Sequence, residues 1–559
     1  MHSIISGVAA VLAGLLGLYF VLRQLLLLTQ DAREPPAIAT TIPFITPIIG
    51  MARFKSKYTV QLRDKHHLPI YTLRYPFQRM YIINSPTLIS AVQRQTKALT
   101  FQAIEDKFSI LITDPSQHAK AIFLKETEQW ANSAPGHQSP SHILYKGLTP
   151  GPGMDSMNRA MVNRLETAVE GLASALSGSG AKKTMKLFAW VKHEITMATT
   201  EGVYGPQNPY RDPEIQDAFW AYEAGLGKLS LGVVPSLLAR EAVRGREKVA
   251  SAFEEYFAAE GTSSSSSLTK GRHEYYAARG YLPRDISKFE CGNGIAILSN
   301  TVPTAYWMLF HLFSNPSALE ACRAEIQAHI TTTAHSGNGA GVTKALDISA
   351  LKTRCPLLLS AFKEAMRLHA IGVGLRMVMT DTMLSNRYLL RKGALVVMPA
   401  IVQHHDANIW GPDVSSYDVA RFTTTTTTSS SASSSSSSSF SSSSPPAAAA
   451  TSQQQRKINP VSFRGFGGGA TLCPGRHFAT TEVLVFVSML MLRFTVEAVG
   501  GWERPSTEKA PMSAVVPGPD SDFEVVIKRR ADDEGVQWVW SLSGSDEGIR
   551  VTAEDMEGK

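Results

Sequence analysis

The first feature of the hydrophobic pattern is an uncharged run close to the N-terminus. Residues 4–22 contain no charged side chain, and Leu25–Leu28 extend the apolar run past Arg23. A helix of about 20 apolar residues crosses the hydrocarbon core of a bilayer. A cleaved signal peptide is the alternative, but it would carry a basic leader, a shorter core and small residues at its cleavage site. Residues 1–34 are therefore predicted to form an uncleaved membrane anchor and hinge.

The residues on either side of this run predict how the chain is oriented. Residues 1–3 precede it without Lys or Arg, whereas Arg23 and Arg33 follow it. Because basic residues beside a membrane helix favour the cytoplasmic side, the rest of the chain is expected in the cytoplasm, attached by a single span. A proline-rich segment, residues 34–47, cannot continue the helix and is expected to act as a stiff connector.

After the connector, the hydrophobic pattern predicts mostly helices together with a few short strands. Most of residues 90–257 have apolar positions at helical spacing. Ile70–Tyr75 and Met80–Ile83 are predicted to pair as a hairpin, and strand-like runs return at residues 494–496 and 523–527.

Two segments depart from this pattern. Residues 423–455 consist largely of Thr, Ser, Ala and Gln, so they cannot bury apolar surface and are predicted to be a disordered insertion. From Ala531 onward the chain is acidic, and residues 531–559 are expected to form a loosely held tail.

Composition narrows the class of protein. With 559 residues, 44% hydrophobic and 18% charged, the chain is globular. Its net charge of +7 forms no long basic run, so nucleic-acid binding is not indicated, whereas a basic surface for an acidic protein is allowed. Four cysteines without a C-x-x-C pair indicate a reducing compartment and argue against a zinc module.

The strongest chemical signal lies in residues 462–479, which read S-F-R-G-F-G-G-G-A-T-L-C-P-G-R-H-F-A. Clustered glycines allow the backbone to lie close to a flat ligand. Cys473 precedes a predicted helix, whose N-terminus favours thiolate over thiol. A thiolate on a glycine-rich bed suits a soft metal, including haem iron. The alternative is that Cys473 is a small buried core residue.

The spacing of this loop resembles that of the cytochrome P-450 family. Its pattern F-x-x-G-x-x-x-C-x-G-x-x-x-A is matched by Phe466, Gly469, Cys473, Gly475 and Ala479. The resemblance covers roughly residues 35–530 and implies the cytochrome P-450 fold, which is mainly α-helical with a small β lobe. It implies haem b bound through the thiolate of Cys473 as the metal ligand. It also implies cofactor contacts from Phe466, Gly469, Gly475, Arg476 and Arg376, the last toward a haem propionate. For Arg376 the alternative is a solvated strand end.

A second motif is predicted on a helix from about residue 355 to 369. Glu364 and Arg367 are three residues apart and share a face of this helix. An ordinary surface ion pair is possible, but the apolar neighbours favour burial, which would need a further partner such as Arg421. The set is similar to the E-x-x-R helix and the downstream R-F element of the family, which by resemblance have a structural role.

The third motif is expected on a helix from Ile286 to Phe313 that resembles the oxygen-activating helix of the family. Asn300 stands where an acid is usual, Thr301 is retained, and Pro303 is expected to kink the helix. We assign catalytic roles to both: the Thr301 hydroxyl relays protons, and Asn300 orients water without titrating. The alternative for Thr301 is a hydrogen bond to an upstream carbonyl.

These departures resemble the branch of sterol 7α-hydroxylases and prostacyclin synthase. Thr471 stands where most members have a basic residue facing a propionate, and Arg159 and Arg164 are the candidates for another propionate contact. Pocket positions are expected at Ile371, Val373 and Leu375 and within residues 515–519.

The resemblance implies a monooxygenase anchored in the endoplasmic reticulum membrane. It would use O2, a lipophilic substrate, and electrons from NADPH delivered by a reductase. The substrate class expected is terpenoid, sterol-like, polyketide or alkaloid, as in fungal secondary metabolism. Arg464 and Arg476 are expected to form part of a basic surface for the reductase. Two alternatives stay open: a haem-thiolate isomerase or dehydratase acting on a peroxide without reductase, and a non-catalytic haem-binding membrane protein.

Overall fold

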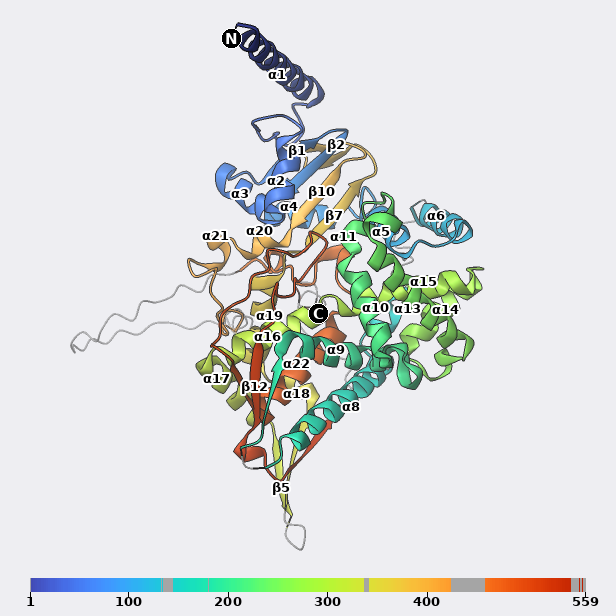
Figure 1. The fold of residues 1–559 in the computed structure, drawn as a ribbon, viewed down its shortest axis with the longest axis vertical. Helices are drawn as coiled ribbons and strands as arrows, with labels where there is room; N and C mark the ends of the chain where they lie inside the picture. The colour runs from blue at the N-terminus through green and yellow to red at the C-terminus, as the bar shows by residue number, and fades with distance from the viewer. Residues whose placement is uncertain are drawn as a thin grey trace, which may run out of the picture.

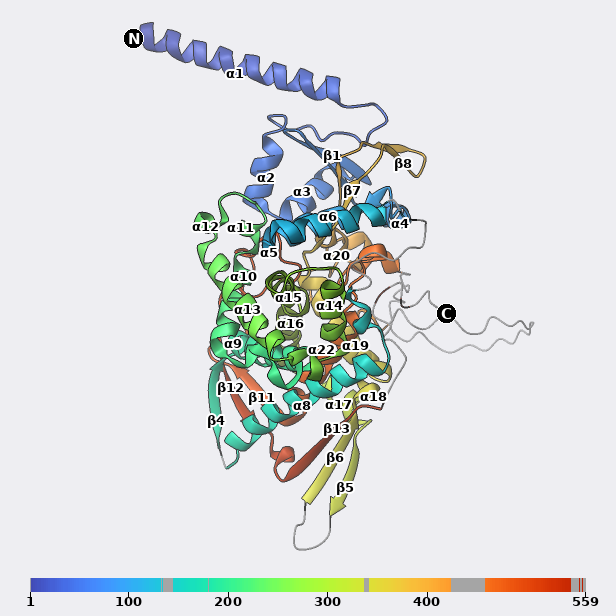
Figure 2. The same ribbon diagram turned by 90° about the vertical axis from the view of Figure 1, so that its right-hand side faces the viewer.

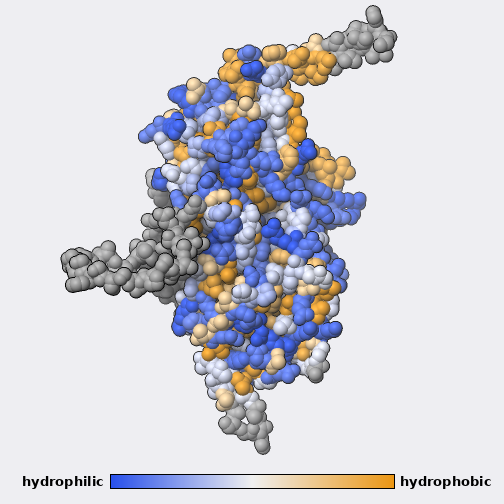
Figure 3. Space-filling model, turned by 90° about the vertical axis from the view of Figure 1, so that its left-hand side faces the viewer, coloured by the Kyte–Doolittle hydropathy of each residue, from blue (hydrophilic) through white to orange (hydrophobic). Residues whose placement is uncertain are grey.

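The computed structural model describes residues 2–131, 133, 144–178, 180–335, 341–423, 458–543, 552 and 555. Helix α1 (His2–Thr29) projects from one end of the molecule (Figure 1). Its residues Leu12–Thr29 are long and apolar enough to cross a membrane and are not buried against the domain. In Figure 3 this part of α1 is an orange projection from a body of mixed polarity.

A five-stranded sheet lies beside the inner end of α1 (Figure 1). Its strand order is β1-β2-β10-β7-β3, and the predicted hairpin is confirmed as the antiparallel pair β1–β2. The strands are β1 (Ile70–Tyr75), β2 (Gln78–Ile83), β10 (Leu395–Pro399), β7 (Val373–Val378) and β3 (Leu99–Thr100).

Helices form the rest of the body, as predicted. Two of them, α16 and α22, are buried on nearly all sides and pack against each other in the main core, as expected for helices that are apolar all round. The helices after α1 are α2 (Thr46–Phe54), α3 (Lys57–His66), α4 (Pro86–Gln93), α5 (Gln102–Thr113), α6 (Gln117–Ala131), α8 (Pro152–Ala175), α9 (Leu187–Tyr204), α10 (Pro213–Ala224), α11 (Leu226–Leu229), α12 (Pro235–Leu238), α13 (Arg240–Ala258), α14 (Ser267–Ala278), α15 (Pro283–Leu298), α16 (Thr301–Phe313), α17 (Pro316–Gln327), α18 (Ile348–Thr353), α19 (Pro356–His369), α20 (Ala400–His404), α21 (Ala407–Trp410) and α22 (Arg476–Arg493).

Within the described residues, three small sheets accompany the helices and the five-stranded sheet. Their strand orders are β11-β12-β4, β13-β6-β5 and β8-β9. The sheet of β13, β6 and β5 lies at the end of the molecule opposite α1 (Figure 2). The strands are β4 (Lys182–Lys186), β5 (Thr331–His335), β6 (Gly341–Asp347), β8 (Thr382–Leu384), β9 (Tyr388–Leu390), β11 (Phe494–Ala498), β12 (Glu524–Arg529) and β13 (Val536–Ser541).

The predicted loose tail is wrong for its first part. Strand β13 pairs in parallel with β6, and its side chains Trp538 and Trp540 are buried and stacked on each other. Burial of two indole rings supplies enough apolar contact to hold an otherwise acidic segment. The predicted insertion at 423–455 lies, after Thr423, outside the described residues.

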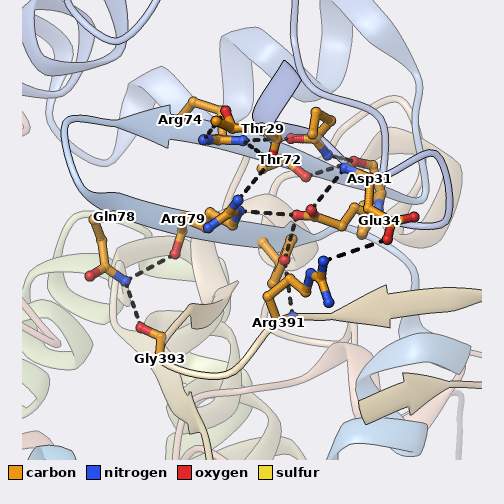
Figure 4. A network of polar contacts seen from close by, with 12 residues as sticks. Thr29, Asp31, Glu34, Thr72, Arg74, Gln78, Arg79, Arg391 and Gly393 are labelled. Carbon is orange, nitrogen blue, oxygen red and sulfur yellow. Dashed lines mark hydrogen bonds and ion pairs between the residues drawn. The ribbon is translucent and has the colours of Figure 1, made fainter. Parts of the chain in front are cut away.

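The junction between α1 and the domain is a network of ion pairs and hydrogen bonds (Figure 4). Arg79 donates to the carbonyl oxygen of Thr29 at 2.7 Å and pairs with Glu34 at 3.3 Å. Arg74 donates to the Thr29 hydroxyl at 2.9 Å. The Glu34 carboxylate is fully buried and accepts a hydrogen bond from Tyr81 at 2.7 Å. The end of α1 is thus fixed to the hairpin β1–β2.

Candidate active site

A buried ion-pair cluster lies on α19, which begins and ends almost where predicted. Both oxygens of the Glu364 carboxylate accept from Arg367, at 2.7 and 2.8 Å, and both side chains are fully buried. Arg421 Nε donates to the same carboxylate at 2.9 Å. The structure therefore brings all three predicted residues together and contradicts the alternative of a surface pair.

His404, at the end of α20, connects this cluster to the glycine-rich loop. Its carbonyl oxygen accepts from Arg367 at 2.7 Å, and its Nε2 accepts from the backbone N–H of Arg464 at 2.9 Å. Burial holds the pKa of His404 well below its ordinary value, so the ring is neutral and its Nε2 can accept. The ion-pair cluster thus fixes the position at which the loop begins.

The loop itself is a tight turn that depends on glycine. Gly467 has φ 80°, and a Cβ there would lie 2.6 Å from the carbonyl oxygen of Thr471. The turn closes where the N–H of Cys473 donates to the carbonyl oxygen of Phe466 at 2.9 Å. Gly475 then caps α22. Cys473 is partly exposed whereas the other three cysteines are buried, which contradicts the interpretation of Cys473 as a buried core residue.

The predicted helix over 286–313 is broken rather than merely kinked. It divides into α15 and α16 at Ser299–Asn300. The physical cause is Pro303, which cannot donate to the carbonyl of Ser299 four residues earlier and whose ring crowds it. Thr301 is the first residue of α16, and its hydroxyl donates to the carbonyl oxygen of Ile297 at 3.3 Å. This is the bond that the alternative for Thr301 described.

Asn300 attaches the break to a loop late in the chain. Its Oδ1 accepts from the N–H of Val516 at 3.3 Å. In the same loop, the Pro517 carbonyl oxygen accepts from the indole N–H of Trp307 at 2.8 Å, and the Val515 carbonyl oxygen accepts from the backbone N–H of Ile371 at 2.8 Å. The predicted pocket segments near residues 371 and 515 are therefore neighbours, and both lie against the broken helix.

Comparison with known proteins identifies the family of this fold and site. The chain is 32% identical over 522 residues to the cytochrome P-450 monooxygenase nodJ of Hypoxylon pulicicidum, covering 92% of this chain and 94% of that protein. The sequence model of the family described as cytochrome P-450 matches residues 295–523. The chain belongs to the cytochrome P-450 family. It is accordingly an oxidoreductase of the class that incorporates oxygen, and the fold class predicted from the sequence is confirmed.

Two further relatives resemble this cytochrome P-450 over most of its length. A cytochrome P-450 monooxygenase of Gibberella zeae is 28% identical, covering 91% of this chain and 92% of that protein. The cytochrome P-450 7B1 of Mus musculus is 24% identical, covering 87% and 90%. Fungal monooxygenases and sterol hydroxylases are thus both among its relatives, which confirms the predicted branch.

The cofactor of cytochromes P-450 is haem held by a cysteine thiolate, and the residues around Cys473 fit it. Arg376 is 1% exposed, which contradicts the alternative of a solvated strand end. Its guanidinium donates to neutral acceptors, the Leu375 carbonyl at 2.7 Å and the Thr471 hydroxyl at 3.0 Å. Burial and the adjacent charge of Arg464 lower the pKa of Arg376 to about 10. Arg376 and the neighbouring Arg464 are both buried, and a guanidinium suits the carboxylates of a haem.

The sulfur does not behave as predicted. Although Cys473 is partly exposed, the protein around its sulfur removes enough solvation to raise the pKa of the thiol above its ordinary value, while the Gly475 N–H and Arg476 act in the opposite direction. Loss of solvation thus outweighs these two contributions, and the pKa of the thiol is raised where the sequence predicted a low value. A bound metal cation would supply the missing stabilisation.

Some residues were assigned incorrectly or missed. Arg159 donates to the Leu542 carbonyl at 3.3 Å and Arg164 pairs with Glu194 at 3.2 Å, so both proposed propionate contacts are directed to other partners. His404 was not recognised as the link between ion-pair cluster and loop. Asp555, which pairs with Arg476, was also missed, because neither contact has a local sequence signal.

Proposed function

We propose that this cytochrome P-450 is a membrane-anchored monooxygenase that inserts one oxygen atom of O2 into a lipophilic substrate. Electrons come from NADPH through a cytochrome P-450 reductase. Residues 1–34 form the anchor and hinge in the endoplasmic reticulum membrane, and residues 35–530 form the catalytic domain on its cytoplasmic side. The apolar span Leu12–Thr29 and its fixed junction with the sheet support this arrangement.

The observation that carries the oxygenase reaction is the position of Thr301 at the helix break. A hydroxyl at the first turn of α16 has only a long bond, 3.3 Å, to the Ile297 carbonyl, so it can exchange that acceptor for water or oxygen. When bound, haem ligated by Cys473 supplies the activation of O2. The Thr301 hydroxyl then positions a water molecule and relays protons through it. Asn300 orients the same water but cannot itself take up a proton.

The remaining site residues hold the cofactor or the frame. Phe466, Gly469 and Gly475 form the bed of the loop, and Arg376 binds a propionate. Glu364, Arg367 and Arg421 have a structural role, because their cluster fixes the loop through His404.

The substrate class is proposed from relatives and pocket chemistry together. A relative from Rattus norvegicus is a 25-hydroxycholesterol 7-alpha-hydroxylase, 24% identical over 70% of this chain. The segments at the helix break present Ile371, Val515 and Val516, which are apolar. We therefore favour a rigid lipophile of the sterol-like or terpenoid kind, with polyketides and alkaloids as the other candidates.

The first experiment is the carbon-monoxide difference spectrum of the reduced protein in microsomes. We expect the red-shifted band of a thiolate-ligated haem in the wild type and its loss in Cys473→Ser. Cys355→Ser is the matched control, because serine is well tolerated at the N-cap position that Cys355 occupies. A histidine-type band in the wild type, or none, would overturn the assignment.

A second candidate function is supported by Asn300. A residue that cannot titrate stands where an acid is usual, and its side-chain amide oxygen accepts from the N–H of Val516. An isomerase or dehydratase acting on a peroxide needs no proton delivery to oxygen and no reductase. Turnover that requires NADPH and reductase supports the monooxygenase; turnover of a peroxide without either supports the isomerase.

A further inference from the structure

An acidic residue from the C-terminal part of the chain lies on the loop that carries Cys473. Asp555 accepts from Arg476 Nε at 2.9 Å and from Arg476 Nη2 at 2.6 Å, a two-pronged ion pair. Arg476 follows Cys473 by three residues, and its Nη1 donates to the Cys473 carbonyl oxygen at 3.3 Å. Asp555 is thus attached directly to the segment that holds the thiolate.

Two cationic side chains and one neutral histidine surround Asp555. Asp555 binds Arg476, and its charge opposes the burial that lowers the pKa of the Lys363 ammonium on α19. His477 Nε2 lies 3.7 Å from the carboxylate, but burial lowers the pKa of His477 to about 4, so this ring is neutral at pH 7. We call Arg476, on α22, and Lys363, on α19, the Arg476 surface; both side chains are partly exposed. Their N–H groups are donors that a carboxylate of any origin can bind.

Hydrogen bonds from Thr552 fix the position of the Asp555 carboxylate and favour its charged form. Thr552 donates to the Asp555 carboxylate through both its backbone N–H at 3.0 Å and its hydroxyl at 2.9 Å. The side chain of Asp555 is 8% exposed and that of Arg476 is 19% exposed. Although burial alone would raise it, these donors hold the pKa of Asp555 below its ordinary value, so the carboxylate is charged at neutral pH.

We propose that Asp555 occupies the position of a carboxylate from an acidic electron-donor protein, and that the chain thereby competes with that protein for its own Arg476 surface. This rests on the proposed function, which requires such a donor. On docking, a carboxylate of the donor protein would replace that of Asp555 on Arg476, so the guanidinium keeps a counter-charge and the free-energy cost of the exchange is small. The Asp555–Arg476 contact therefore weakens binding of the donor without preventing it.

The test measures binding of a purified NADPH–cytochrome P-450 reductase to the haem-loaded full-length enzyme in lipid nanodiscs. We expect Asp555→Ala to bind about three- to fivefold more tightly than the wild type, the range of a partly exposed ion pair. Glu534→Ala is the matched control, because it removes one negative charge from an exposed position of the same C-terminal region. It should leave the affinity unchanged.

The salt dependence provides a second readout. The difference between wild type and Asp555→Ala should close near about 0.5 M salt, where charges are screened. Equal affinity of wild type and Asp555→Ala at low salt, or an equal gain in Glu534→Ala, overturns the proposal, as does failure of every variant to bind reductase. Loss of the thiolate-type carbon-monoxide band in the wild type would instead remove the proposed function, so the two failures are distinguishable.

Discussion

Arg421 Nε lies 2.9 Å from Oε1 of Glu364, although the two residues are 57 positions apart. The same carboxylate accepts two bonds from Arg367, so one fully buried acid compensates two guanidinium groups. Through the carbonyl and ring of His404, this arrangement extends to the backbone of Arg464. The stability of the Cys473 loop therefore depends on a carboxylate that is distant in sequence.

Replacing Glu364 by Ala should destabilise the folded protein by about 3–5 kcal/mol, because two buried cations lose their counter-charge. The measurement is urea unfolding of the detergent-solubilised holoenzyme. Asp413→Ala is the control: Asp413 also pairs with Arg421, at 2.8 Å, but its side chain is 53% exposed, so about 0–1 kcal/mol is expected. Equal losses in the two variants would contradict this account.

Replacing Thr301 by Ala should separate consumption of NADPH from product formation. Without the hydroxyl, protons must come from water that no side chain holds in place. The amount of product formed per NADPH consumed should therefore decrease by about tenfold or more. Thr304→Ala is the matched control, since Thr304 is similarly buried and its hydroxyl donates to the Asn300 carbonyl at 2.6 Å. Unchanged coupling in Thr301→Ala would remove the proton-relay role.

Replacing Asn300 by Ala should release the Val516 loop. Loss of the acceptor removes one hydrogen bond, worth about 1 kcal/mol, and amide exchange at Val516 should accelerate by about fivefold. Asn300→Asp retains an oxygen acceptor and should keep the slow exchange. If both variants exchange like the wild type, the loop is held by other contacts.

The buried pair His311–His369 should make the fold sensitive to acid. Their Nε2 atoms lie 2.8 Å apart, and burial, with the charge of Arg504, lowers the pKa of His311 to about 3 from 6.5. In the unfolded chain His311 binds a proton as the pH falls below about 6.5, whereas in the folded protein it does so only near pH 3. The stability present above pH 6.5 is therefore lost progressively as the pH falls toward 3.

The test compares the free energy of unfolding at about pH 7.5 and pH 5.5. Wild type should lose roughly 1.4 kcal/mol more than His311→Asn, because one pH unit below the unfolded pKa corresponds to that energy. His118→Asn, at an exposed histidine, should behave as the wild type. An identical pH dependence in all three proteins would show that His311 does not titrate on unfolding.

Elements with a local signal were predicted well from the sequence. Helix α19 and the hairpin β1–β2 have apolar spacing and turn residues that specify them locally. The helix break was predicted as a kink at Pro303, and its displacement to Ser299–Asn300 follows from the backbone rule that proline acts on the residue four earlier.

Features that depend on distant partners were not predicted. Strand β13 depends on parallel hydrogen bonding to the edge of β6, which lies nearly 200 residues earlier in the sequence. The position of Asp555 on Arg476 and the bond from Val516 to Asn300 likewise join segments that have no common pattern. The thiol pKa was predicted in the wrong direction because the helix N-terminus is visible in the sequence, whereas the extent of burial is not.

The fixed junction at Thr29 couples the orientation of α1 to that of the catalytic domain. A rigid helix of 28 residues is about 42 Å long, and it is held at one end by Arg74 and Arg79 on the sheet that also contains Arg376. When this helix lies in a bilayer, any change in its tilt turns the whole catalytic body with it. The thickness of the surrounding lipid would then set the height at which a dissolved substrate meets the protein.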